Sequence, residues 1–159
     1  SVSLLLQQSI SQYLSYPFPP LFNKPIKMGA TAEGYDPRRS KVSDNTMEAF
    51  RTQASLTGDL KEVPGIGPSA VKKLKEEGID NTYQLLGHYM KLAVTEEDEN
   101  GENTKVDTYL LNQQFWEFLK TTGIASHRSA IVKAVCEKVA SNYPAFHDAN
   151  IYDDDDEED

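Results

Sequence analysis

A glycine-rich turn at residues 63–68 is the part of this chain whose residue types and spacing best suit a chemical task. Val63-Pro64-Gly65-Ile66-Gly67-Pro68 is followed by Lys72 and Lys73 in an amphipathic segment. The two glycines permit backbone angles closed to other residues and let a ligand approach the main chain closely. Pro68 suits the first position of a helix, whose free N–H groups and positive dipole end favour an anion. The pattern is typical of a helix-hairpin-helix turn that holds a nucleic-acid phosphate.

The predicted anion contacts are the main chain of this turn and the basic residues behind it. Ile66 lies between the two glycines and is expected to anchor the turn in a core. Arg128, in the first turn of the last predicted helix, is a further candidate. A simpler interpretation, a tight turn between two packed helices that binds nothing, remains open. The complete set of candidates is Gly65, Ile66, Gly67, Ser69, Ala70, Lys72, Lys73 and Arg128.

The rest of the chain offers little that could carry out catalysis or hold a metal. His88, His127 and His147 have no metal-ligand spacing and no paired thiol or carboxylate, so we expect them to be structural or exposed. The sequence shows no nucleophile–base pair and no acidic metal cluster within its helical pattern. We therefore predict that the protein is not an enzyme and that it needs no cofactor and no metal.

The formal net charge of −9 is distributed unevenly along the chain. Seven of the 25 acidic residues form the unbroken run 153–159, and six more lie in the polar segment 95–107. The remaining twelve acidic residues are outnumbered by the 16 lysines and arginines of the chain, or by 15 if Lys105 of the polar segment is left out. The folded part is therefore mildly basic, and it is compatible with a nucleic-acid partner.

Helical periodicity and helix-capping signals place the elements that must position the turn. We expect a helix from Ser43 or Asp44 to about residue 55, a short one at 59–62, and the helix 68–77 ending before Gly78. A fourth helix follows Asp80 as its cap, and two more cover about 107–122 and 126–142. Residues 95–107 are expected to be a polar loop. Since no segment alternates with period two, the predicted fold class is all-α.

The composition also suggests where the folded domain begins and ends. Residues 1–42 are expected to be disordered, and 1–27 not to belong to the working protein, because Met28 resembles a natural start; a targeting peptide is the alternative. We expect a helical domain at 43–147 and a disordered acidic tail at 148–159, which either keeps the protein soluble or folds back onto the basic turn. The single cysteine, Cys136, fits a reducing compartment. No apolar run is long enough to span a bilayer, so we expect no membrane insertion.

From about Asp44 to Phe146 the chain resembles the barrier-to-autointegration factor family, which comprises small dimeric DNA-bridging proteins of the metazoan nucleus. The acidic tail would make it a divergent member. Phe50 also precedes Gly65 by fifteen residues, which is the spacing of the family. The matching stretches are Gly65-Ile66-Gly67, Lys72-Lys73-Leu74, Glu77-Gly78, Tyr83, Leu86-Gly87 and Phe115 with Glu117-Phe118-Leu119-Lys120.

The resemblance implies a compact five-helix SAM-like domain that contains the helix-hairpin-helix motif. It implies sequence-independent binding of double-stranded DNA on chromatin and bridging of two duplexes by a homodimer. The family's DNA contacts correspond to the turn amides of Gly65, Gly67, Ser69 and Ala70 and to Lys73. Its dimer contacts correspond to the region of Leu86, Gly87 and Phe118, to which the apolar helix around them adds Tyr89.

Three departures from the family pattern limit what the resemblance implies, and two of them, the missing basic residues of the first helix and the acidic tail, favour a different class of function. Thr46 and Glu48 stand where the family places basic residues, the segment 95–107 accounts for most of an insertion, and the acidic tail is foreign to it. The alternative is a SAM-like protein-interaction module with weak or no DNA binding. A LEM-domain-like or other nuclear protein is a further candidate partner.

Overall fold

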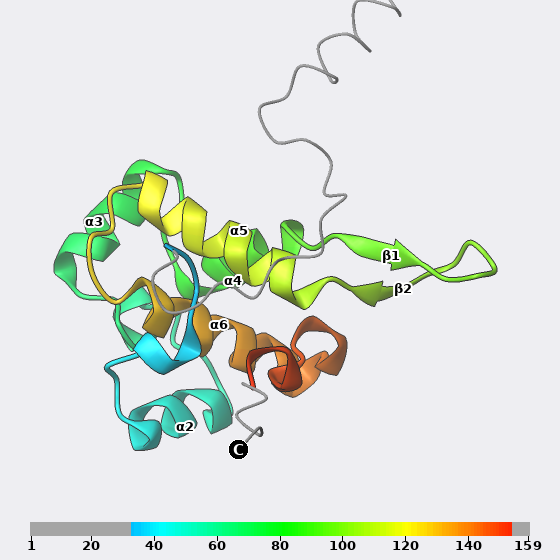
Figure 1. The fold of residues 1–159 in the computed structure, drawn as a ribbon. Coiled ribbons are helices and arrows are strands. Elements are labelled where there is room, and N and C mark those ends of the chain that lie inside the picture. The colour runs from blue at the N-terminus through cyan, green and yellow to red at the C-terminus, as the bar shows by residue number, and fades with distance from the viewer. Residues whose placement is uncertain (1–32, 154–159) are drawn as a thin grey trace, which may run out of the picture. The chain divides into compact units, whose positions relative to one another are not determined.

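The computed structural model describes residues 33–153, apart from the side chains of Asn103 and Thr104. The expectations for residues 1–27, and for most of the acidic run, lie outside the described residues. Within them the chain is mainly helical (Figure 1), which confirms the coarse fold class predicted from the sequence. The α-helices are α2 (Asp44–Thr52), α3 (Pro68–Glu76), α4 (Thr82–Lys91), α5 (Thr108–Thr121) and α6 (Arg128–Asn142).

Three helices begin at side-chain caps that the sequence made recognisable. The Ser43 hydroxyl accepts from the Thr46 amide at the start of α2, and the Asp107 carboxylate accepts from the Leu110 amide at the start of α5. The cap of α4 was predicted one residue too early, because Asn81, not Asp80, accepts from the Gln84 amide at 2.9 Å. Each cap satisfies an N–H group that has no partner within its own helix.

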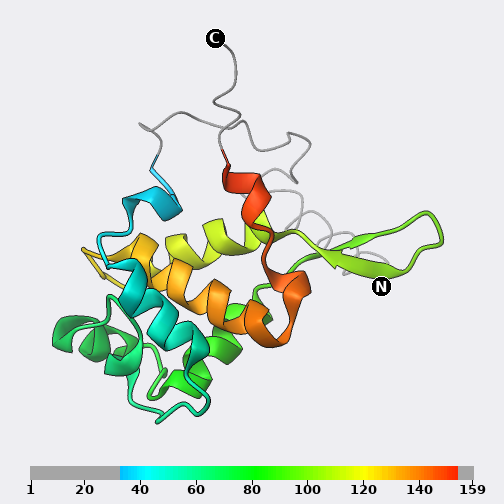
Figure 2. The same ribbon diagram turned by 90° about the horizontal axis from the view of Figure 1, so that it is seen from below.

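Helix α6 lies at the centre of the domain and packs against α2, α4 and α5 (Figures 1 and 2). Ile131, Val135 and Val139 form a buried stripe at four-residue spacing, and Val132 and Cys136 are buried beside it. A helix buried on most of its surface loses the one-sided pattern of a surface helix. Burial of this central helix assembles the other elements around a single core.

Residues 95–107 form a β-hairpin, so the prediction of a loop there is wrong. Strands β1 (Thr95–Glu97) and β2 (Asn103–Val106) pair antiparallel, and the hairpin projects away from the helices (Figure 1). Asp98 organises its turn, since one carboxylate oxygen accepts from the amides of Asn100 and Glu102 at 2.9 Å each. The exposed residues of β1 are all polar or charged, so the hairpin gives none of the alternation by which a half-buried strand is recognised.

The ordered domain also extends beyond the predicted boundaries of 43–147. Tyr35 is only 8% exposed in the core, and the 3-10 helix η1 (Pro37–Arg39) follows it. At the other end, η3 (Pro144–Phe146) and η4 (Ala149–Tyr152) continue the chain. The rings of Tyr35 and Tyr152 meet edge to face at 5.1 Å. The expected disorder of residues 33–42 and 148–152 is therefore wrong, because the contact between the buried Tyr35 and the half-buried Tyr152 ties down both segments.

A single carboxylate holds the chain that leads into the glycine-rich turn. Glu62, in the 3-10 helix η2 (Leu60–Glu62), accepts from the Gly58 amide and the Thr82 hydroxyl at 2.8 Å each. Gln53 and the Thr57 amide donate to its other oxygen. Partial burial acts to raise the pKa of Glu62, but these hydrogen bonds outweigh it and hold the pKa below its ordinary value. The carboxylate thus joins the end of α2, the turn and α4.

Candidate nucleic-acid interface

The turn at residues 63–66 is a type II β-turn in which each residue has a specific role. The Ile66 amide donates to the Val63 carbonyl at 3.0 Å. Pro64 occupies the second position, and Gly65, with φ +93°, occupies the third, where a positive φ is required. A Cβ on Gly65 would lie 3.1 Å from Cγ1 of Ile131. Gly65 therefore serves both the turn and its packing on α6, and Ile66 is buried as an anchor.

Gly67 has a different role, and the prediction that it needs special backbone angles is wrong. Its φ of −103° and ψ of −174° are those of an ordinary N-cap residue. A Cβ at this position would meet no atom within 4 Å. The space in front of Gly67 is therefore open, which lets an external group approach the main chain.

The first turn of α3 presents N–H groups that no side chain caps. The Gly67 carbonyl accepts from the Val71 amide at 3.0 Å. Gly67 is the N-cap residue of α3, and it has no side chain that could accept hydrogen bonds from the amides of Ser69 and Ala70. Ser69 is exposed, whereas the Ala70 methyl group is buried. The amides and the dipole of α3 together make a positive site directly beside the open space at Gly67.

The two candidate lysines of α3 lie on different sides of the helix. Lys72 is exposed and lines a shallow hollow with Lys61 and Lys75. Lys73 is half-buried, and a Cβ on Gly123 would lie 3.6 Å from its Cδ, Cε and Nζ atoms. Gly123 follows the last turn of α5, where a cation is favoured by the helix dipole. Lys73 therefore has a structural contact in addition to any contact with a phosphate.

The connection between α5 and α6 joins these parts into one face. At one end Gly123 contacts Lys73, and at the other His127 lies so close to Gly65 that a Cβ there would be 3.2 Å from the His127 Cβ. His127 is the N-cap of α6 in a left-handed conformation, with φ 61°, and its side chain makes no capping hydrogen bond. The glycine-rich turn, the uncapped start of α3 and the start of α6 are therefore neighbours.

A basic pocket of about 420 Å³ opens at the start of α6. We define the basic pocket by Arg39 and Lys41 from the N-terminal segment, Arg128 and Ser129 from α6, Ser126, and Trp116 from α5. None of the residues that line it is acidic. It combines positive charge, hydroxyl donors and a helix N-terminus, and these are the groups that bind phosphate oxygens.

Arg128 is held in the basic pocket by two contacts. Its Nη1 donates to the Ile124 carbonyl at 2.8 Å, and its guanidinium lies 4.6 Å from the centroid of the Trp116 ring. Lys120 approaches the same ring at 5.6 Å. Trp116 is only 5% exposed. It orients a cation whose charge no carboxylate in the pocket neutralises.

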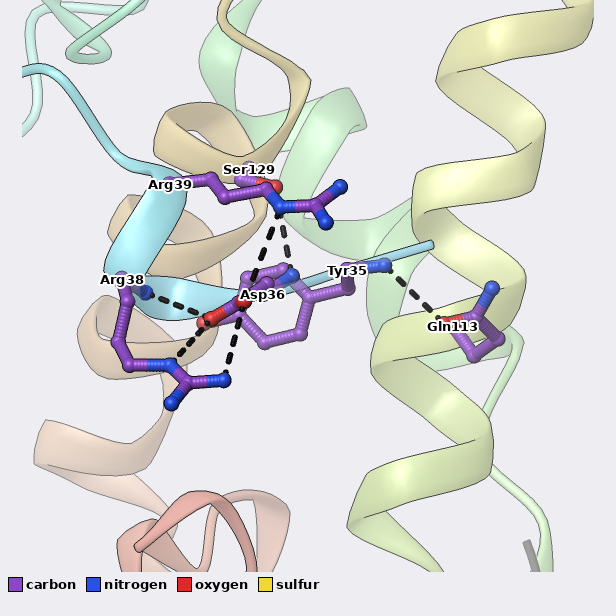
Figure 3. Close-up of polar contacts among 6 residues, drawn as sticks. All are labelled: Tyr35, Asp36, Arg38, Arg39, Gln113 and Ser129. Carbon is purple, nitrogen blue, oxygen red and sulfur yellow. Dashed lines mark hydrogen bonds and ion pairs between the residues drawn. The ribbon is translucent and has the colours of Figure 1, made fainter. Parts of the chain in front are cut away.

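Asp36 fixes the N-terminal segment beside the basic pocket (Figure 3). Its carboxylate pairs with Arg38 at 3.1 Å and with Arg39 at 3.8 Å, and its amide donates to the Ser129 hydroxyl at 3.4 Å. Desolvation acts to raise the pKa of Asp36, but the hydrogen bonds and charge of Arg38, with the charge of Arg39, lower it below its ordinary value. The ionised carboxylate thus orients this segment at physiological pH.

The sequence prediction missed Arg39 and Lys41 as site residues. Both lie within residues 1–42, which were expected to be disordered. The signal that could have found them is Tyr35, a large aromatic residue just before them. Its burial orders the residues that come after it in the chain.

The predicted dimer contacts divide into two groups. Leu86, Gly87 and Phe118 are half-buried, and a Cβ on Gly87 would meet no atom within 4 Å. Tyr89, by contrast, is 0% exposed, and its hydroxyl donates to Asn112 at 2.7 Å in the core. The assignment of Tyr89 to the dimer interface is therefore wrong, because Tyr89 lies with Leu85, four residues before it, on the buried side of α4.

The other reactive residue types are accounted for by the core or lie apart. Burial raises the pKa of the Cys136 thiol, and the nearby Glu137 charge adds to this effect, so the thiol is poorly reactive. His88 packs on Phe118 with a ring separation of 4.1 Å. Within residues 33–153, no group of three or more His, Cys, Asp or Glu side chains is arranged to hold a metal ion. In the same part of the chain no helix has the length and hydropathy of a membrane span.

Comparison of the sequence with protein-family models gives no match, and comparisons with curated proteins and with solved structures give none either.

Proposed function

We propose that this protein binds the backbone of double-stranded DNA without regard to sequence. The observation that carries the proposal is that the uncapped start of α3, behind the open Gly67, adjoins a basic pocket built from Arg39, Lys41 and Arg128. Two neighbouring anion sites on one face suit successive phosphates of a nucleic-acid strand. The net charge of −9 is no obstacle, because thirteen of the acids lie in the acidic run and in the β-hairpin region.

The expected contacts explain why binding would not depend on sequence. Main-chain amides and lysine or arginine side chains reach phosphate oxygens, and such contacts position a protein but carry no base information. Arg128 is held by Trp116 and the Ile124 carbonyl, so it presents a fixed charge rather than a side chain free to probe a groove. Lys73 and Lys72 would add charge on either side of α3.

The same proposal includes a symmetric homodimer that bridges two duplexes, with membership of the barrier-to-autointegration factor family and a SAM-like fold. The half-buried residues Leu86, Gly87 and Phe118 support a subunit interface. A two-fold axis near them would carry one DNA-binding face to each side of the dimer. Such a protein would act on chromatin in the nucleus, with a cytoplasmic pool, and it would need no catalytic residue, metal or cofactor.

A second candidate function is a SAM-like protein-interaction module with weak DNA binding. Helix α2 favours it, because Glu48 is exposed and pairs with Arg51 at 3.4 Å, where a DNA-binding helix would carry uncompensated cations. A LEM-domain-like or other nuclear protein is the partner expected in that case. The basic pocket favours the first candidate.

Fluorescence anisotropy with two labelled 20-base-pair duplexes of unrelated sequence tests the proposal. We expect equal affinity for both and a log–log salt dependence of about 0.9 for each phosphate neutralised. Absence of binding at low salt would leave the protein-interaction module. A large difference between the two sequences would contradict backbone recognition.

A further inference from the structure

The chain enters its acidic run next to an aromatic contact with the N-terminal segment, the segment that also supplies residues of the basic pocket. Tyr152 is the last residue of η4, and its ring packs on Tyr35 at 5.1 Å. Tyr35 is flanked by Gly34, which lines the pocket, and by Asp36, whose amide donates to the pocket residue Ser129. The hydroxyl of Tyr152 also accepts a hydrogen bond from the Asn112 side chain at 3.0 Å. The ring contact and this hydrogen bond together fix Tyr152, which anchors the start of the acidic run.

The sequence after the anchor complements the pocket in charge. Residues 153–159 are seven consecutive aspartates and glutamates. A stretch of seven residues can reach on the order of 20 Å when extended. The pocket residue Gly34 is next to Tyr35 in the chain, so we take this length to be sufficient to reach the pocket from Tyr152. The N-terminal segment and η4 lie on the same side of the domain in Figure 2.

We propose that residues 153–159 bind in the basic pocket of their own chain, with their carboxylates on Arg39, Lys41 and Arg128. Carboxylates and phosphate oxygens accept the same charge-assisted hydrogen bonds from guanidinium and ammonium groups. The acidic run therefore takes the place of a backbone phosphate when no nucleic acid is bound. The tether supplies it at a roughly millimolar effective concentration, so modest intrinsic affinity is enough for occupancy.

The consequence for DNA rests on the proposed function, whereas the contact itself does not. If the pocket binds DNA, the acidic run competes with it most strongly at low ionic strength, where charge interactions are least screened. Release of the run would then raise DNA affinity without any change in the fold.

The contact can be observed without DNA through Trp116, the single tryptophan of the chain, which lies against Arg128 in the pocket. The test variant neutralises residues 154–157 by Asp→Asn and Glu→Gln changes. The matched control neutralises four acids of the β-hairpin region in the same way, Glu96, Glu97, Glu99 and Glu102, and keeps Asp98, which organises the turn. Both variants of the full chain gain four units of charge outside the helical core.

We expect the NMR signals of the Trp116 indole N–H and the Arg128 Nε–H to shift in the test variant at low salt. In the control they should stay at their wild-type positions, and in the wild type 0.5 M NaCl should reproduce the shift. These shifts should not depend on protein concentration. Unchanged signals in the test variant, equal shifts in both variants, or a concentration dependence that indicates a second copy would each overturn the proposal.

The effect on DNA is measured separately on the same two variants. We expect the test variant to bind a duplex several-fold more tightly at low salt and the control to bind about as the wild type does. NMR shifts as expected with no DNA binding in any variant would overturn the proposed function but leave the contact intact. Equal affinity gains in both variants would show general charge repulsion and would contradict competition for the pocket.

Discussion

The guanidinium of Arg128 lies over the indole ring of Trp116, with 4.6 Å between its central carbon and the ring centroid. The pair joins α5 to the first turn of α6 at the wall of the basic pocket. A cation over the face of a tryptophan is stabilised by the ring quadrupole, and the bond to the Ile124 carbonyl fixes its direction. These two contacts set the position of a charge that we propose to bind DNA.

The two glycines of the turn should separate binding from folding. Gly67→Asn places a good N-cap side chain where no atom lies within 4 Å, and its amide oxygen can accept from the α3 amides that a phosphate would use. We expect unchanged or slightly raised thermal stability and at least a tenfold loss of duplex affinity by anisotropy. An affinity equal to that of the wild type would show that the start of α3 is not part of the DNA interface.

Gly65→Ala is the matched comparison at the neighbouring glycine. It forces a φ of +93° on a residue with a Cβ and brings that Cβ to 3.1 Å from Ile131. We expect a loss of about 1–3 kcal/mol in the free energy of unfolding, measured by urea denaturation. Stability equal to that of the wild type would show that neither the turn geometry nor the packing on α6 constrains this position.

Lys41 should contribute charge to DNA binding without contributing to the fold. It is exposed at the basic pocket and forms no ion pair with any of the described residues. Lys41→Gln should weaken binding equally on unrelated duplexes and reduce the salt slope by about 1. Lys91→Gln is the control, since Lys91 is exposed in the last turn of α4. Equal effects of the two changes would show that only net charge matters.

The subunit interface should depend on Leu86 and not on Tyr89. Leu86→Glu places a charge on the half-buried face of α4, and we expect light scattering at micromolar concentration to report a monomer that binds DNA but does not bridge it. Tyr89→Phe should leave the dimer intact and lower stability by about 1 kcal/mol, because it removes the buried bond to Asn112. A monomeric wild type would exclude bridging but not binding.

Glu62 should stabilise the protein in a pH-dependent way. Because its folded pKa lies below its ordinary value, its contribution is present at neutral pH and is lost as the pH falls through the folded pKa. Glu62→Gln should cost about 1–3 kcal/mol at pH 7. The difference from the wild type should shrink below about pH 4. Chemical denaturation at both pH values measures it, and Glu99→Gln, on the exposed hairpin, should show no such difference.

The sequence alone determined those features that depend on neighbours along the chain. The helix starts at Ser43 and Asp107 and the break at Gly78 follow from local propensity and spacing. The Val63–Pro68 turn could also be predicted, because proline and glycine restrict the backbone by themselves. These local rules identified the α3 half of the candidate site.

Tertiary contacts decided the remaining features of the fold and of the candidate site, and the local sequence pattern gives little indication of these contacts. Tyr35 and Tyr152 are far apart in the chain, yet their contact orders both terminal segments and brings Arg39 and Lys41 to the basic pocket. The burial of Tyr89 depends on Asn112 of α5, so helical periodicity could not separate it from Leu86. The second half of the candidate site therefore exists only because the core brings distant side chains together, and hydrophobic burial rather than local propensity provides the free energy for that.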